Sequence, residues 1–300
     1  MLRRAIHSGS WYKGTPSALS EQIEGWMKNV PNNLLKDDSK KTSKGLIAPH
    51  AGYTYCGQIM AHSYKYINPE NIKRVFIFGP SHRVYIKGCT LPQFSIYECP
   101  LGDMEVDTEV CKELEKTKLF TKLSKSGEEQ EHSIEMELPF ISYAMGNQPF
   151  KIIPIIFGVF SEKLEEKYIE IFKPYLEQPD TFFVISSDFC HWGERFDYTY
   201  LPPLNNTLPD SKKLVIADRI EMLDKEAIKM IETGDPDAFD DYLERTDNTI
   251  CGRTGIKLLL SLLDQSSFNP SIKFLKYGQS NRVVSKKDGS VSYATAIINV

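Results

Sequence analysis

Histidine is scarce in this chain of 300 residues, which contains only six. Cysteine is equally rare: the six cysteines are scattered and form no C-x-x-C pair. No apolar run reaches the roughly 20 residues of a membrane span, and the start, "MLRRAIHSGSWYKG", lacks the apolar core of a secretory signal. We therefore expect no membrane span and reduced thiols, in a cytoplasmic protein that also enters the nucleus.

No segment concentrates charge of one sign. The formal net charge is -4, and Lys and Arg are scattered among Asp and Glu along the chain, so the pattern of a nucleic-acid-binding surface is missing. A content of 41% hydrophobic and 25% charged residues excludes a disordered chain. There is no internal repeat and no low-complexity linker. We expect one domain over residues 1–300.

Apolar runs alternate with amphipathic stretches along most of the chain. Strands are expected where the runs are short and bounded by turn residues, at 45–48, 74–78, 150–159, 181–187, 271–280 and 290–300. Helices are expected at 16–27, 58–67, 133–145, 161–176, 214–231 and 235–246, and one more begins at Asp107. This order predicts an α/β fold, a single domain with a central, mostly parallel or mixed sheet flanked by helices.

Three of the six histidines follow apolar runs: His50 in "GLIAPHAGYTYCG", His82 in "RVFIFGPSHR" and His191 in "TFFVISSDFCHWG". The carboxyl ends of parallel strands are where α/β proteins bind ligands. Such a group of imidazoles indicates a metal site or an acid/base site. The alternatives are a buried His50 that hydrogen-bonds the backbone and a His82 on a surface loop. Tyr55, in the same turn as His50, is a candidate pocket residue.

Two carboxylates lie near histidines in the chain. Asp188 precedes His191 by three residues and could orient its ring for proton transfer or ligation, or cap a helix instead. His132 and Glu135 are spaced i and i+3 at the start of an expected helix, which is typical of neighbouring faces. They are candidates for a second shell or a proton relay, although the polar start of any helix can look the same.

Cys251, in "NTICGRTG", precedes an apolar helical stretch. It could fill the core, act as a nucleophile at a helix N-terminus, or ligate a soft metal ion. We expect Cys190 to point into the core, and His7 and His62 to be structural.

Seven motifs in order along almost the whole chain resemble the Memo family, a group of mediators of receptor-driven cell motility with bacterial and archaeal relatives. They are "HSGSWY", "IAPHAGYTYCG", "GPSH", "EHSIEMELP", "SSDFCHWG", "NTICGR" and "SVSYA". The contexts of Cys190 and Cys251 resemble the eukaryotic branch. The resemblance implies a fold similar to the class III non-haem iron dioxygenases, which open catechol rings.

The resemblance also implies roles for individual residues. His50 and His82 match the two histidine ligands of those dioxygenases, His191 matches their acid/base, and Cys251 matches the third ligand position. A thiolate in place of a carboxylate shifts metal preference toward copper or a thiolate-bound iron and exposes an oxidisable ligand. Ring cleavage is therefore not expected.

Two functions from different classes follow. In the first, the protein is a copper- or iron-dependent oxidoreductase that acts in motility and invasive-growth signalling, and His191, oriented by Asp188, moves protons. In the second, a vestigial active-site pocket binds a partner, such as a phosphotyrosine peptide of a signalling protein. The metal content of the purified protein would separate the two.

Overall fold

The computed structural model describes residues 1–35, 42–203 and 214–300, and it has an α/β fold built on a mixed sheet. Within the described residues the sheet has nine strands in the order β10-β12-β2-β9-β3-β8-β4-β7, and β11 pairs with β12. The strands are β2 (Ser43–Ala48), β3 (Arg74–Pro80), β4 (Cys89–Thr90), β7 (Phe120–Thr121), β8 (Lys151–Phe157), β9 (Thr181–Ser186), β10 (His191–Trp192), β11 (Ser271–Gln279) and β12 (Ser290–Asn299). The predicted fold class is confirmed.

Four neighbouring strands at the centre of this sheet are parallel. β2 pairs with β9, β9 with β3, and β3 with β8, whereas β12 and β4 run antiparallel to their neighbours β2 and β8. These central strands are almost entirely buried, as expected for continuous apolar runs that are covered on both faces. The carboxyl ends of β2, β3 and β9 therefore meet at one edge of the sheet.

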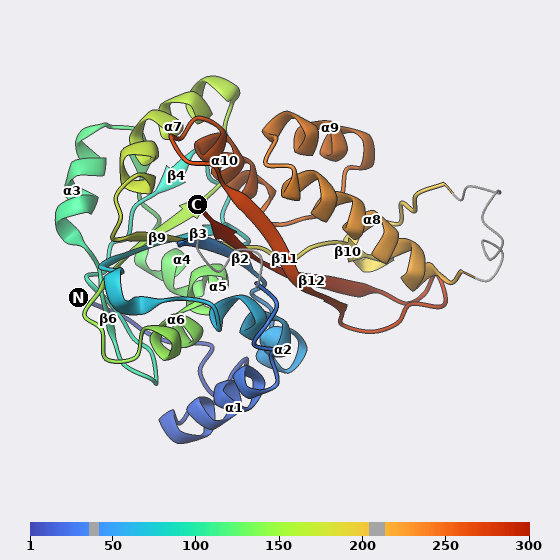
Figure 1. The fold of residues 1–300 in the computed structure, drawn as a ribbon, viewed down its shortest axis with the longest axis horizontal. Helices are drawn as coiled ribbons and strands as arrows, with labels where there is room; N and C mark the ends of the chain where they lie inside the picture. The colour runs from blue at the N-terminus through green and yellow to red at the C-terminus, as the bar shows by residue number, and fades with distance from the viewer. Residues whose placement is uncertain (36–41, 204–213) are drawn as a thin grey trace.

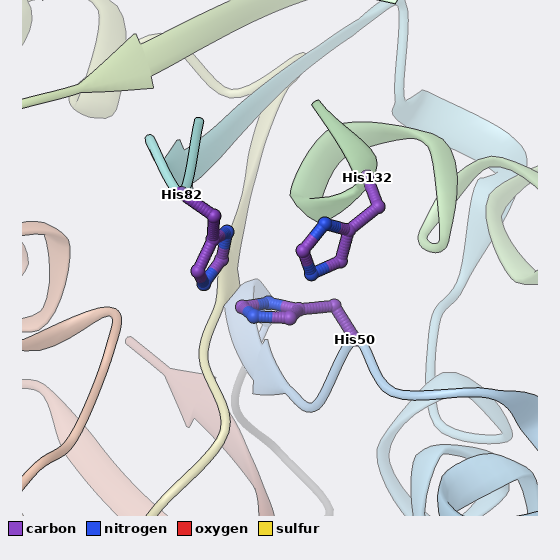
Figure 2. A group of neighbouring side chains, drawn as sticks. All are labelled: His50, His82 and His132. Atoms are coloured by element: carbon purple, nitrogen blue, oxygen red, sulfur yellow. The ribbon is translucent and has the colours of Figure 1, made fainter. Parts of the chain in front are cut away.

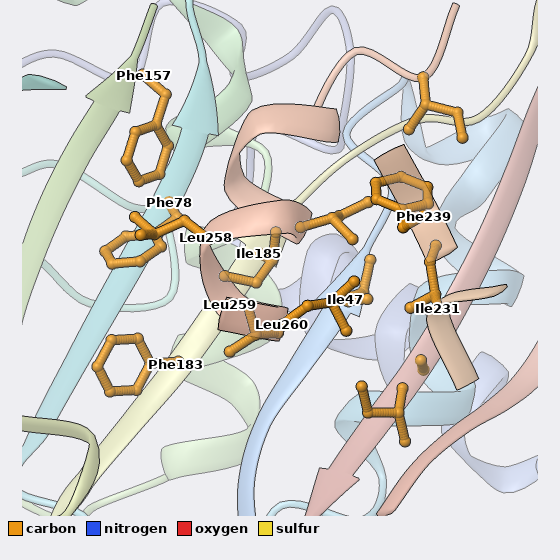
Figure 3. Close-up of a cluster of buried hydrophobic side chains, with 14 of the residues drawn as sticks. Ile47, Phe78, Phe157, Phe183, Ile185, Ile231, Phe239, Leu258, Leu259 and Leu260 are labelled. Carbon is orange, nitrogen blue, oxygen red and sulfur yellow. The ribbon is translucent and has the colours of Figure 1, made fainter. Parts of the chain in front are cut away.

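The helices cover both faces of the sheet (Figure 1). Their bounds are α1 (Pro16–Lys28), α2 (Tyr53–Tyr64), α3 (Thr108–Lys116), α4 (Lys125–Gln130), α5 (His132–Glu135), α6 (Leu138–Met145), α7 (Glu162–Leu176), α8 (Ile216–Glu232), α9 (Pro236–Thr246) and α10 (Arg253–Asp264). One core cluster contains residues of α1, α2 and α6, and the other contains residues of α7, α8, α9 and α10. Figure 3 shows Leu258 and Leu259 of α10 beside the sheet residues Phe78 and Ile185.

A small second sheet joins the N-terminus to the region between residues 91 and 106. It consists of β1 (Leu2–Arg3), β5 (Ile96–Tyr97) and β6 (Met104–Glu105). These two-residue strands bring the first residues of the chain close to α4 and α5, where Arg3 contacts the carbonyl oxygens of Glu128 and Glu131.

Two expected helices differ in the structure. The helix expected over 133–145 is two helices, α5 and α6, and Pro139 lies in the first turn of α6, where a missing N–H costs no hydrogen bond. The helix expected at 58–67 begins at Tyr53, immediately after the Gly52 turn. Because α2 begins this early, Tyr55 lies in its first turn, close to His50.

No helix in the described part of the chain is both long and apolar enough to cross a membrane.

Candidate metal centre

Three histidine side chains meet at the edge where β2, β3 and β9 end. The His50 and His82 ring centroids are 5.1 Å apart, those of His50 and His132 are 5.4 Å apart, and those of His82 and His132 are 4.4 Å apart. Figure 2 shows the three rings pointing toward one another. One nitrogen of each ring lies within 4.8 Å of the others, a spacing that fits ligands about 2 Å from a shared ion.

The Cys251 thiol lies beside this group, next to His50. Its Sγ lies 3.2 Å from His50 Nε2 and accepts a hydrogen bond of 3.1 Å from the Asp188 amide. The chain can approach β9 this closely because the next residue is Gly252, at which a Cβ would lie only 2.4 Å from the Ser187 Cβ. Burial raises the pKa of the Cys251 thiol, and the neighbouring His82 opposes that increase.

Glu131 determines which nitrogen of His82 faces the cluster. The carboxylate accepts hydrogen bonds from the His82 amide at 2.6 Å and from Nδ1 at 2.9 Å, so Nε2 is the nitrogen that can ligate a metal ion, in exchange for its proton. Burial alone would lower the pKa of His82, but Cys251 and Glu131 raise it to about 10. Burial would likewise raise the pKa of Glu131, but His82 lowers it to about 2.

His132 lies at the first position of α5 and is mostly buried. Its Nδ1 has no hydrogen-bond partner within the described residues, and the nearest carboxylate oxygen, of Glu131, is 3.5 Å away. Burial and the neighbouring His82 lower the pKa of His132 to about 4. A neutral imidazole with an unused nitrogen is a ready metal ligand. The sequence pattern predicts for His132 only a role in supporting a ligand or relaying a proton, and the structure adds the possibility of direct ligation.

His191 reaches the same cavity, but Asp188 does not orient it. The His191 Nδ1 lies 2.9 Å from the Phe189 carbonyl oxygen and 3.2 Å from that of Thr249, so the backbone holds the ring. The Asp188 carboxylate instead accepts from the His50 amide at 2.9 Å. The expected Asp188–His191 pair is therefore wrong, because the strand exit turns the Asp188 side chain toward β2. Burial raises the pKa of Asp188 to about 7.

Glu135 is buried away from the cluster. It accepts hydrogen bonds from Arg3 at 2.9 Å, from the His7 amide at 2.8 Å and from Tyr12 at 3.0 Å, and it thereby ties the N-terminal segment to α5. This role is structural, and the hydrogen-bond partners of the Glu135 carboxylate are Arg3, His7 and Tyr12. Tyr55 is 61% exposed at the mouth of the cavity.

The remaining cysteine and histidine expectations are met. Cys190 is fully buried in the core. His7 and His62 are buried and hydrogen-bonded, through Nδ1, to Glu135 and to the Gln58 carbonyl oxygen.

The histidine cluster opens into a cavity of about 710 Å³. Aromatic side chains of Trp11, Tyr55 and Phe196 line it together with His191 and Arg195. The Arg195 guanidinium lies 4.5 Å from the Phe196 ring centre and pairs with no carboxylate of the described residues. The cavity thus combines metal-ligand donors with an aromatic and cationic wall.

Comparison with known proteins agrees with the motifs. The family model described as Memo-like protein matches residues 3–297. The chain belongs to the Memo family. It is 44% identical to Protein MEMO1 of Xenopus laevis and 42% identical to that of Homo sapiens, in each case over 100% of this chain and 98% of the relative. Protein memo-1 homolog of Caenorhabditis elegans is 40% identical over 99% of this chain and 83% of the relative.

The donor set of this Memo-family chain suits a transition metal. Two imidazoles present one nitrogen each, a third has an unpartnered nitrogen, and a thiol lies within 3.2 Å of the first. Imidazole and thiolate together suit copper, iron and zinc and are poor ligands for Mg²⁺ or Ca²⁺. The residues therefore fit a metal ion of this kind.

The sequence pattern did not identify Glu131, the carboxylate that orients the His82 ring. Glu131 lies within the acidic run "GEEQEH", close to the two other glutamates Glu128 and Glu129. Its position directly before His132 was the available signal. Its true partner, His82, is 49 residues away in the chain.

Proposed function

We propose that this Memo-family protein binds one redox-active ion, copper or iron, through His50, His82 and Cys251, and acts in cell-motility signalling. The observation that supports it best is the placement of the Cys251 Sγ 3.2 Å from His50 Nε2, with the His82 ring centroid 5.1 Å from that of His50. These residues come from three distant parts of the chain. His132 is available as a further ligand, since one of its ring nitrogens lies within 4.8 Å of a nitrogen of His50 and of His82.

The protein's own groups prepare the site for such an ion. The hydrogen bond between Glu131 and the His82 Nδ1 leaves the His82 Nε2 on the side of the cluster. The hydrogen bond between the backbone and the His191 Nδ1 leaves the His191 Nε2 on the side of the cavity. When bound, copper or iron would supply one-electron chemistry. His191 would hold or move a proton at its Nε2, next to the cavity.

Replacing the thiol tests the ligand set. Cys251→Ser should weaken Cu(I) binding at least tenfold, because a hydroxyl is a poor ligand for a soft ion, and should affect a harder divalent ion much less. The measurement is calorimetric titration under anaerobic, reducing conditions. Cys111→Ser, a partly buried thiol on α3, is the matched control and should bind Cu(I) like the wild type. Equal Cu(I) affinity of Cys251→Ser and wild type would exclude thiolate ligation.

His191 separates an oxidoreductase from a binding module. His191→Ala should leave metal affinity nearly intact but lower metal-dependent oxygen or peroxide reduction about 100-fold, since loss of a general acid/base typically has this effect. The assay compares the loaded protein with the same concentration of free metal. If the loaded wild type reduces nothing above free metal, the oxidoreductase proposal fails.

The alternative function is that of an adaptor, and the cavity wall favours it. Arg195, without a carboxylate partner in the described part of the chain, lies beside Trp11, Tyr55 and Phe196, a combination that can hold an anionic aromatic group. Under this proposal a phosphotyrosine peptide binds metal-free protein, and Arg195→Gln weakens the complex while Cu(I) binding is unchanged.

A further inference from the structure

A series of buried, hydrogen-bonded polar side chains begins at the His50 ring, on the side away from the cavity. Ser186, the last residue of β9, lies 2.7 Å from the His50 Nδ1, 2.7 Å from the Ser133 carbonyl oxygen and 2.9 Å from the Glu137 Oε1, all measured from its Oγ. The Tyr64 hydroxyl donates to the other Glu137 oxygen at 2.7 Å. Ser186 and Glu137 are 0% exposed, so their side chains are out of contact with bulk solvent.

Proton counting around Ser186 allows one arrangement. A hydroxyl has one proton to donate and two lone pairs to accept with. The Ser133 carbonyl can only accept, so the Ser186 proton goes there, and its Oγ must accept from both other neighbours. The His50 Nδ1 and the Glu137 Oε1 must therefore each carry a proton. Any other arrangement places two acceptors in contact, at a cost of about 1–3 kcal/mol for each buried group left unsatisfied.

We propose that Glu137 is held as a neutral carboxylic acid and, through Ser186, restricts His50 to the tautomer with its proton on Nδ1. The His50 Nε2 then presents a lone pair toward Cys251 and the centre of the cluster. The inference deepens the proposed metal site, because it explains how one of its ligands is prepared. Ser186 and Glu137 are positioning residues, since Ser186 contacts only the far nitrogen of the His50 ring and Glu137 acts through Ser186.

The surroundings of Glu137 favour the neutral acid. Burial raises the pKa of Glu137 well above its usual range, hydrogen bonding with Tyr64 and Ser186 acts against that increase, and the Asp188 charge adds to it. An ionised Glu137 would place a second negative charge near Asp188 and the Cys251 thiol. His82 and His50 are thus oriented in different ways. His82 is held by the ionised carboxylate of Glu131, and His50 is held by the uncharged pair of Ser186 and Glu137.

The decisive measurement uses metal-free protein labelled with ¹⁵N-histidine. Long-range ¹H–¹⁵N spectra distinguish a protonated from a bare ring nitrogen, and the His50 signals are identified by their loss in His50→Gln. The expected result is a protonated Nδ1 and a bare Nε2. A His50 ring with its proton on Nε2 overturns the proposal, and this test requires no variant of the buried chain to fold.

Variants test each link of the chain. Glu137→Gln should keep the His50 tautomer, because the amide donates to Ser186 as the acid does, but should abolish an infrared C=O band of a protonated carboxylic acid present in the wild type at neutral pH. Ser186→Ala should mix the tautomers and weaken Cu(I) binding about 10–100-fold, as typical for a residue that supports a ligand. Tyr64→Phe is the matched control and should keep the tautomer.

Each contrary result is informative. No loss of a carboxylic-acid C=O band in Glu137→Gln means that Glu137 is ionised, and an unchanged tautomer in Ser186→Ala means that Ser186 does not orient the ring. Either outcome overturns the proposal. Failure of the wild type to bind metal, with the Nδ1-protonated tautomer present, would refute the proposed function and leave this inference standing.

Discussion

At the scale of single residues, the cluster depends on groups that hold each ring in one orientation. Glu131 accepts three N–H groups, from the His82 amide, the His82 ring and the Ser133 amide. It therefore caps the start of α5 and orients His82 with the same two oxygens.

Glu131→Gln should weaken metal binding about 10–100-fold, the usual effect of removing a partner that orients a ligand. The amide places an NH₂ group where one carboxylate oxygen now accepts, so at least one N–H of His82 or Ser133 loses its acceptor. Calorimetry with Cu(I) measures the affinity. The control is Glu129→Gln, whose carboxylate pairs with the exposed Arg4 and should matter little. Similar affinities of both variants would refute a positioning role for Glu131.

At the scale of elements, close backbone approaches bring the start of α10 against the end of β9. A Cβ at Gly252 would lie 2.4 Å from the Ser187 Cβ and 2.6 Å from the Ser186 carbonyl oxygen. Gly79 at the end of β3 also permits a close approach, since a Cβ added there would lie 2.5 Å from the Ser133 Oγ. These two glycines let α10 and α5 approach the strand ends and bring Cys251 and His132 to the cluster.

Gly252→Ala should destabilise the protein by about 1–3 kcal/mol, as overpacking typically does, and should also weaken Cu(I) binding because α10 must move and carries Cys251 with it. Urea unfolding and calorimetry measure the two effects. Gly25→Ala is the matched control: Gly25 lies inside α1 with nothing within 4 Å of an added Cβ, so the change should be neutral or slightly stabilising. Wild-type stability and affinity of Gly252→Ala would contradict the argument.

At the scale of the whole molecule, a buried carboxylate connects the helices on one face of the sheet to the loop that bears His191. Asp224 of α8 is 0% exposed and accepts hydrogen bonds from the Cys190 amide at 3.2 Å and from the Tyr277 hydroxyl at 2.8 Å. Burial raises the pKa of Asp224 to about 6, although hydrogen bonds from Ser292, Tyr277 and Asn248 oppose the increase.

This shift predicts a pH dependence of stability. Because the folded pKa exceeds the ordinary value of 3.8, the folded state binds the proton more tightly. The resulting stability is fully present below pH 3.8 and is lost as the pH rises through about 6. The difference corresponds to roughly 3 kcal/mol.

The test is urea unfolding at a series of pH values across this range. Asp224→Asn should remove this part of the decline, whereas Asp241→Asn, at an exposed position of α9, should keep the wild-type slope. A wild-type slope in Asp224→Asn would show that other groups account for the decline.

Local patterns in the sequence were sufficient to predict the central strands, most helices, the α/β class and the family. Hydrophobic periodicity and turn residues are properties of neighbouring residues, so the strands before His50, His82 and Asp188 could be predicted without coordinates. The convergence of His50 and His82 followed from the rule that parallel strands end at one edge. The early start of α2 and the break between α5 and α6 were not predicted, because Gly52 and Pro139 act there through turn geometry.

Only the tertiary structure decided which group each histidine contacts. Sequence proximity suggested Asp188 for His191 and Glu135 for His132, yet Asp188 binds the His50 amide and Glu135 binds Arg3 and His7. The partners that orient the ligands, Glu131 for His82 and Ser186 for His50, lie 49 and 136 residues away in the chain. Hydrogen bonds require separations near 3 Å and suitable direction, and folding brings these distant segments that close.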